Sequence, residues 1–195
     1  MLAQNTDNLA QASNTWLKSY YLVRFAVSAA WVALAFTVAK TMPPLAAIML
    51  VAYPAWDALA NVIDARRTGG MSRNKSQLLN FVISVLATLA VAIALTNSMN
   101  AVLAVYGVWA VLSGLFQLIT AVRRWKTSGA QWAMILSGAQ SALAGIFFVK
   151  MAGGVEDIGI TNVAPYAAFG AFYFLVSAVW LTVSDILRKS PRIAS

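Results

Sequence analysis

The stretch Tyr53-Pro54-Ala55-Trp56-Asp57-Ala58-Leu59-Ala60-Asn61-Val62-Ile63-Asp64-Ala65-Arg66-Arg67 carries a carboxylate into an otherwise apolar run and ends in a basic pair. At about 100° per residue, a helix here places Tyr53, Asp57, Asn61 and Asp64 within roughly 80° of one another. The stretch therefore predicts a helix with one polar stripe. Asp57 is the acidic residue that lies deep in the apolar segment.

The composition of the whole chain favours a membrane protein. Of its 195 residues, 61% are hydrophobic and only 10% are charged, which is too apolar for an ordinary soluble domain. The net charge of +8 could suit nucleic acid, but the Lys and Arg residues lie in short clusters between apolar runs. We expect membrane lipids as partners and no nucleic acid.

The residue types that are missing limit the chemistry. The sequence has neither Cys nor His, so thiolate nucleophiles, Cys-ligated metals and the usual general base are excluded. An enzyme would have to work with six carboxylates together with Lys, Tyr and Ser. The sequence predicts no catalytic residue, no cofactor and no metal site, and a protein that is not an enzyme.

Six apolar runs are long enough to cross a bilayer, which takes about 20 residues each. Pro43 and Pro44 separate the first two runs because proline cannot continue the helical hydrogen-bond ladder. A polar turn from Thr96 to Asn100 separates the third from the fourth. The six expected helices are Tyr20–Lys40, Pro44–Ile63, Leu78–Thr96, Asn100–Val122, Trp132–Met151 and Pro165–Leu187.

The expected domain organisation is one transmembrane domain with a short tail at each end. Residues 1–19 form a polar N-terminal tail, residues 20–189 the six-helix domain, and residues 190–195 a C-terminal tail. The first fifteen residues have no early positive charge, so they do not resemble a signal peptide.

The charge pattern predicts the orientation in a bacterial inner membrane. Lys40 and Lys150 fall on one side together with the acidic pair Glu156-Asp157. By the positive-inside rule, the other side and both termini are cytoplasmic. That side holds the remaining basic residues, Lys18, Arg24, Arg66, Arg67, Arg73, Lys75, Arg123, Arg124, Lys126, Arg188, Lys189 and Arg192.

An internal repeat adds to this picture. The second, fourth and sixth expected helices each end in a basic pair, Tyr53-x-x-Trp56 resembles Tyr106-x-x-Trp109, and Phe25-x-x-Ser28 resembles Phe81-x-x-Ser84. The predicted fold class is therefore an all-α membrane protein of six transmembrane helices, arranged as three repeated hairpins with approximate threefold symmetry.

One part of the chain resembles a known family. The residues that carry the resemblance are Gly107-Val108-Trp109-Ala110-Val111-Leu112-Ser113-Gly114-Leu115-Phe116-Gln117-Leu118-Ile119-Thr120-Ala121-Val122-Arg123-Arg124, followed by Trp132, Leu136-Ser137-Gly138 and Gly145. Together they resemble the HdeD-like family of bacterial inner-membrane proteins, over residues 20–189 and most strongly over 78–149. The resemblance implies a six-helix integral protein without an established enzymatic activity, whose namesake is linked to acid resistance.

The candidate site is an intramembrane polar cluster of Arg24, Tyr53, Asp57 and Asn61. A carboxylate at mid-bilayer costs roughly 2.5 to 3.5 kcal/mol on insertion scales, so a partner is expected, and Arg24 is the basic residue inside the first helix. We hypothesise an Arg24–Asp57 pair. It either locks two helices together, which we favour, or serves a small transporter or channel for a proton, ion or small solute.

Three further features have mainly structural interpretations. Pro54 should kink the second helix near Asp57. Small residues from Ser137 to Gly145 favour close helix packing within one chain over an oligomer interface, although a homo-oligomer or a partner membrane protein stays open. Basic residues should contact anionic headgroups, namely Arg66, Arg67, Arg123, Arg124, Lys126, Arg188 and Lys189.

Overall fold

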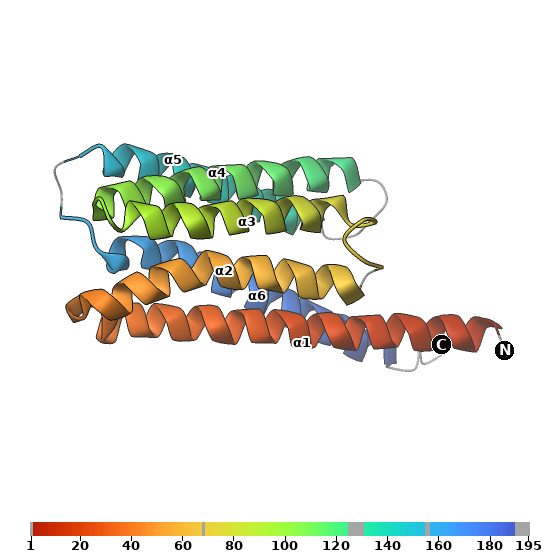
Figure 1. Ribbon diagram of the computed structural model, residues 1–195. Coiled ribbons are helices and arrows are strands. Elements are labelled where there is room, and N and C mark those ends of the chain that lie inside the picture. Colours follow the sequence, from red (N-terminus) through yellow and green to blue (C-terminus); the bar gives the residue numbers. More distant parts are fainter. Residues whose placement is uncertain (1, 68, 125–130, 155–156, 190–195) are drawn as a thin grey trace. The chain divides into compact units, whose positions relative to one another are not determined.

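The computed structural model describes residues 2–67, 69–124, 131–154 and 157–189, and it is helical almost throughout these ranges (Figure 1). No glycine or proline interrupts the chain before Pro43, which explains why the first helix begins at Leu2, well inside the segment predicted as a polar tail. The elements are α1 Leu2–Thr37, η1 Ala39–Thr41, α2 Pro43–Arg67, α3 Lys75–Ala94, α4 Met99–Arg124, α5 Gln131–Ala152 and α6 Ile160–Lys189.

Each of the six α-helices contains a segment long and apolar enough to cross a membrane. These segments are Thr15–Thr37, Pro43–Arg67, Lys75–Ala94, Met99–Ile119, Ile135–Ala152 and Ile160–Leu187. The protein is therefore a multi-span membrane protein, and the predicted fold class of six apolar helices packed in hairpin pairs is confirmed. The orientation in the membrane and the threefold symmetry stay predictions.

Two breaks between helices lie where the sequence predicted them, α2 and α3 both extend a few residues into the predicted loop between them, and the start of α6 is shifted. The short η1 precedes the two prolines, and α3 and α4 are separated by the polar turn. The helix α6 begins at Ile160 rather than at Pro165. Its start is stabilised by Asn162, whose side-chain oxygen accepts a hydrogen bond from the Gly159 amide at 2.8 Å.

The chain divides into two compact units, which are described separately. One consists of Met1–Val32 and Ala167–Ser195, and the other of Ala33–Tyr166. In the second unit, α2 packs along α3, α3 along α4, and α4 along α5. The Asn100 amide at the start of α4 also donates to the Ala152 carbonyl at the end of α5, at 3.1 Å.

The end of α2 is defined by two glycines with positive φ. Gly69 has φ 106° and Gly70 has φ 92°, a region that side chains other than glycine rarely adopt. The Gly70 amide reaches back to the Ala65 carbonyl at 2.7 Å, the bond that closes a helix in a Schellman motif. This arrangement terminates α2 directly after the basic pair Arg66-Arg67.

The helices α4 and α5 approach each other through glycines. A Cβ atom on Gly114 would lie 2.5 Å from the Gly138 carbonyl oxygen, and one on Gly107 would lie 2.7 Å from the Gly145 carbonyl oxygen. The two facing pairs are about two turns apart on each helix, as antiparallel packing requires. The small residues of α5 therefore pack within one chain, which confirms the favoured interpretation for Gly138 and Gly145.

Candidate functional site: a polar cluster between α2, α3 and α4

The polar stripe of α2 lies on one face, as the sequence predicted. The Asn61 amide donates to the Asp57 backbone carbonyl at 2.8 Å and to Asp57 Oδ2 at 3.1 Å. Asn61 is buried and Asp57 is half-buried. The structure therefore brings these two predicted site residues into direct contact within a single helix.

The stripe faces α3. The Ser84 hydroxyl donates to Asp57 Oδ2 at 2.8 Å, and the Gln77 amide donates to Asp64 Oδ2 at 3.0 Å. The second bond lies about two turns further along α2 and two turns back along α3, so both bonds belong to one antiparallel register. Two carboxylates of α2 thus hold the same neighbouring helix.

The cluster continues from α3 to α4. The Trp109 indole N–H donates to Ser84 Oγ at 3.1 Å, while the Ser84 hydroxyl proton points to Asp57. A serine hydroxyl can act as donor and acceptor at once, and Ser84 does both while fully buried. The result is a continuous hydrogen-bonded chain from Trp109 through Ser84 to Asp57, which joins three helices.

A second bond joins α4 to α2 at Pro54. Proline has no N–H, so the Leu50 carbonyl one turn earlier lacks the donor that a regular helix would supply. The Tyr106 hydroxyl donates to that carbonyl at 2.7 Å. Because Leu50 and Tyr106 are both fully buried, this hydroxyl takes the place of the missing amide.

Aromatic rings surround the Trp109 indole. Edge-to-face contacts join it to Tyr53, with ring centroids 6.1 Å apart, to Tyr106 at 5.6 Å and to Tyr166 at 5.9 Å. The Tyr166 hydroxyl lies 3.1 Å from the hydroxyl of Ser141 on α5. The predicted site residue Tyr53 therefore contributes to the cluster through its ring packing against Trp109.

The predicted site residue Arg24 lies in the other unit. Its guanidinium carbon stands 4.2 Å from the ring centroid of Phe174, and one guanidinium nitrogen donates to the Tyr20 hydroxyl at 3.2 Å. An arginine over an aromatic face is stabilised by the negative potential of the ring. Since Arg24 and Asp57 belong to different units, their pairing stays a prediction.

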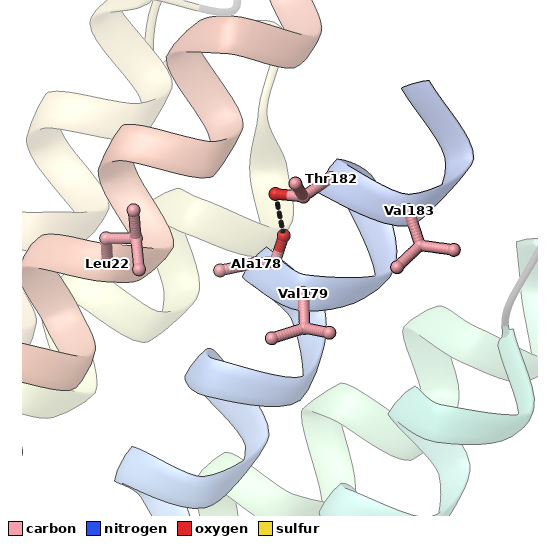
Figure 2. A pocket seen from close by; sticks show the side chains of 5 residues that line it. All are labelled: Leu22, Ala178, Val179, Thr182 and Val183. Atoms are coloured by element: carbon pink, nitrogen blue, oxygen red, sulfur yellow. Dashed lines mark hydrogen bonds between the residues drawn. The ribbon is translucent and has the colours of Figure 1, made fainter. Parts of the chain in front are cut away.

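The same unit contains an ion pair and a small apolar hollow. Lys18 Nζ and Asp185 Oδ2 are 2.7 Å apart and join α1 to α6. The hollow, of about 150 Å³, lies between Leu22 of α1 and four residues of α6 (Figure 2). Thr182 lines it but directs its hydroxyl to the Ala178 carbonyl at 2.8 Å, so the hollow offers little polar chemistry.

The predicted headgroup-contacting residues are only partly described. Arg66 and Arg67 are exposed at the end of α2. Arg123, Arg124, Arg188 and Lys189 belong to the last turns of α4 and α6, with side chains outside the described part. Lys126 and Glu156 lie outside the described residues, whereas Asp157 is exposed.

Sequence reasoning did not assign Ser84, Trp109 and Tyr106 to the cluster. All three stood out as parts of the repeated patterns Phe81-x-x-Ser84 and Tyr106-x-x-Trp109, which were interpreted as marks of internal repetition. The useful signal was that each pattern places a hydrogen-bonding side chain inside an apolar helix, where it needs a partner.

Comparison with known proteins gives one match. Residues 79–150, from early α3 to the end of α5, match a family described as a short repeat of unknown function, DUF308. The matched segment contains Ser84, Tyr106, Trp109 and the four glycines of the α4–α5 contact. No curated protein and no solved structure matches the chain. The chain is thus a multi-span membrane protein in which α3, α4 and α5 are similar to the DUF308 short repeat.

Proposed function

We propose that the chain is a non-enzymatic integral protein of the bacterial inner membrane, of the HdeD-like class, that acts in envelope or acid-stress tolerance. Support comes from the six apolar helices and from the DUF308 match over residues 79–150. This is the part of the chain in which the resemblance to HdeD-like proteins is strongest. Both termini are cytoplasmic in this proposal, with the basic helix ends against anionic lipids.

The observation that carries the non-transport part of the proposal is the group at which the chain of hydrogen bonds to Asp57 starts. It starts at the Trp109 indole, a group that only donates and keeps its proton, and runs through Ser84 to the carboxylate. Such a chain fixes helices but does not pass protons along its length. The cluster therefore supports a structural role for Asp57, which holds α2 against α3 and α4.

A small transporter or channel for a proton, ion or small solute is the second candidate. It is favoured by the partial exposure of Asp57. This residue is only half-buried, whereas Ser84 and Asn61, which donate to it, are buried. A carboxylate with an accessible side inside a membrane helix is a common element of ion pathways. In this case Asp57 would be reached by water from one side of the membrane.

Survival of a bacterial host at low external pH tests the first proposal. The host expresses the chain, its Asp57→Asn variant or the control variant Asp64→Asn, each checked for folded protein in the membrane. We expect the chain to raise survival, and we expect Asp57→Asn to retain this effect because asparagine keeps an acceptor for Ser84.

Two outcomes would decide against parts of the first proposal. A folded wild-type chain that gives no protection contradicts the role in acid tolerance. A folded Asp57→Asn variant that loses protection, while Asp64→Asn keeps it, favours the transporter. Flux measurements on proteoliposomes with the same two variants then identify the transported ion.

A further inference from the structure

Pro54 divides α2 into two parts that are held by different bonds. The part before proline is bonded at Leu50 to Tyr106, and the part after it is bonded at Asp57 through Ser84 to Trp109 and at Asp64 to Gln77. Tyr106 and Trp109 are one turn apart on α4, so a single face of α4 holds both parts. The ribbon of α2 also changes direction along its length, as expected for a helix with an internal proline (Figure 1).

The two bonds differ in what happens when each is broken. The Leu50 carbonyl is fully buried and has lost its helical donor to Pro54, so without Tyr106 it would be left as a buried acceptor without a donor. Opening the bond at Asp57 leaves the Ser84 hydroxyl without this acceptor, but the carboxylate keeps a donor, because Asn61 on the same helix donates to the same oxygen. The bond before proline is therefore costly to break, and the bond after proline is cheaper.

From this asymmetry we infer that α2 is a two-part helix hinged at Pro54. The Tyr106–Leu50 bond is its fixed latch, and the Trp109–Ser84–Asp57 chain is its releasable latch. When the releasable latch and the Asp64–Gln77 bond open together, the part of α2 after Pro54 moves away from α3 and keeps the Asp57–Asn61 bond. The moving part ends in Arg66-Arg67, so the hinge changes the position of a basic pair next to the glycine turn.

The hinge operates whether or not the protein acts in acid tolerance. It depends on the proline, on the two latches and on the extra donor within α2, all of which belong to one unit of the structure. Conformational changes of this type commonly use a few residues that absorb the change in direction, with rigid segments on each side.

Distances between pairs of nitroxide labels test the hinge in the full-length protein. The chain has no cysteine, so two introduced cysteines are labelled without background. Ile48→Cys with Ile93→Cys reports on the part of α2 before Pro54, and Leu59→Cys with Val82→Cys on the part after it. All four positions are exposed, and each pair lies in the α2–α3 register set by the Asp57–Ser84 bond.

We expect Ser84→Ala to add a longer-distance population to the Leu59–Val82 pair and to leave the Ile48–Ile93 pair unchanged. Asp57→Ala, which removes the acceptor of the same α2–α3 bond, should do the same if Ser84→Ala does not fold. Thr88→Ala is the matched control, because Thr88 donates to the Ser84 backbone carbonyl within α3 and takes no part in either latch.

The proline provides the decisive comparison. In a Pro54→Ala background the helix regains its backbone bond, so Ser84→Ala should add a smaller long-distance population. Three results would overturn the hinge: no change in the Leu59–Val82 pair, an equal change in both pairs, or an undiminished change in the Pro54→Ala background. An equal change in both pairs would mean that α2 moves as one rigid rod.

Discussion

At the scale of single residues, the bond from Tyr106 to the Leu50 carbonyl shows how a membrane helix can contain proline. The interior of a bilayer offers no water to the carbonyl that proline deprives of its donor. A neighbouring helix must then supply the hydrogen bond, and the Tyr106 hydroxyl does so at 2.7 Å.

Removing this hydroxyl should destabilise the protein. We expect Tyr106→Phe to lower the free energy of unfolding by about 1 to 2 kcal/mol, because the buried carbonyl loses its donor while the ring stays. Reversible unfolding in mixed micelles measures the change. In a Pro54→Ala background the loss should be clearly smaller, since the backbone amide of the introduced alanine serves the same carbonyl. Equal losses in both backgrounds would contradict the proposed relation between Tyr106 and Pro54.

Two substitutions at Asp57 distinguish how much its hydrogen-bond acceptor contributes to stability from how much its charge contributes. Asp57→Asn keeps an oxygen for Ser84 and should change the free energy of unfolding by less than about 1 kcal/mol. Asp57→Ala leaves the Ser84 hydroxyl and the Asn61 amide without this acceptor and should cost about 1 to 2 kcal/mol. If the two variants lose equally, the charge of Asp57 rather than its hydrogen bonds holds the helices.

The sequence predicted Asp57 and Asn61 as neighbours because both lie on one helix, where 3.6 residues per turn fix the geometry. It did not predict Ser84 as their partner. Contacts between helices depend on how each helix is rotated and shifted against the next, and an apolar helix of nearly uniform composition carries little information on either. Ser84, Tyr106 and Trp109 were therefore interpreted as parts of repeated sequence patterns rather than as members of the polar cluster.

At the scale of helices, two contacts have a well-defined register. The α2–α3 register is set by hydrogen bonds from Ser84 and Gln77, and the α4–α5 register by the facing glycines. The α2–α3 contact is held by polar side chains, whereas the α4–α5 contact depends on glycines, which let the two helix backbones approach closely. These are the two means by which helices associate in a lipid environment, where hydrophobic attraction between them is weak.

The glycine contact predicts a clear response to a single methyl group. Gly114→Ala would place Cβ 2.5 Å from the Gly138 carbonyl oxygen and 2.6 Å from the Ala142 nitrogen. We expect a loss of about 1 to 3 kcal/mol, as for other overpacked sites, although alanine favours a helix more than glycine does.

Gly153→Ala is the matched control for this prediction. A Cβ atom there has its nearest neighbour at 3.6 Å, so the effect should stay within about 0.5 kcal/mol. Both variants can be compared by thermal unfolding in detergent. A Gly114→Ala variant as stable as Gly153→Ala would show that α4 and α5 separate at little cost.

Helix boundaries were predictable where the sequence contains a strong signal. Pro43 and Pro44 and the polar residues from Thr96 to Asn100 mark breaks that the structure confirms. The beginnings of α1 and α6 were less predictable. Residues 2–14 are polar enough to suggest a tail, yet nothing in them breaks a helix, and α6 starts before Pro165 because Asn162 supports an earlier turn.

At the scale of the whole molecule, the distribution of charge predicts the orientation in the membrane. The end of α2 and the loop that follows it carry Arg66, Arg67 and Arg73, whereas the turn between α3 and α4 has no basic residue. The positive-inside rule then places the first loop in the cytoplasm and the turn outside.

Single cysteines test this orientation directly. Ser72 and Asn97 are both exposed, and the chain has no other cysteine to react. In intact cells, a thiol reagent that does not cross the membrane should label Asn97→Cys at once. It should label Ser72→Cys only after the membrane is permeabilised. The opposite pattern would place both termini outside and would reverse the assignment of every loop.

The hydrogen bonds from Asn61 to Asp57 have a consequence for biosynthesis. A nascent chain leaves the ribosome from its N-terminus, so α2 enters the bilayer before α3 can offer Ser84 and before α4 can offer Trp109. A carboxylate waiting alone in lipid carries an insertion cost of roughly 2.5 to 3.5 kcal/mol. Asn61 is synthesised in the same helix and donates to Asp57 at 3.1 Å, so it can accompany the carboxylate through the translocon. Asn61 then supplies a hydrogen bond to the carboxylate during insertion, and the Ser84 hydroxyl adds a second one when α3 has entered the bilayer.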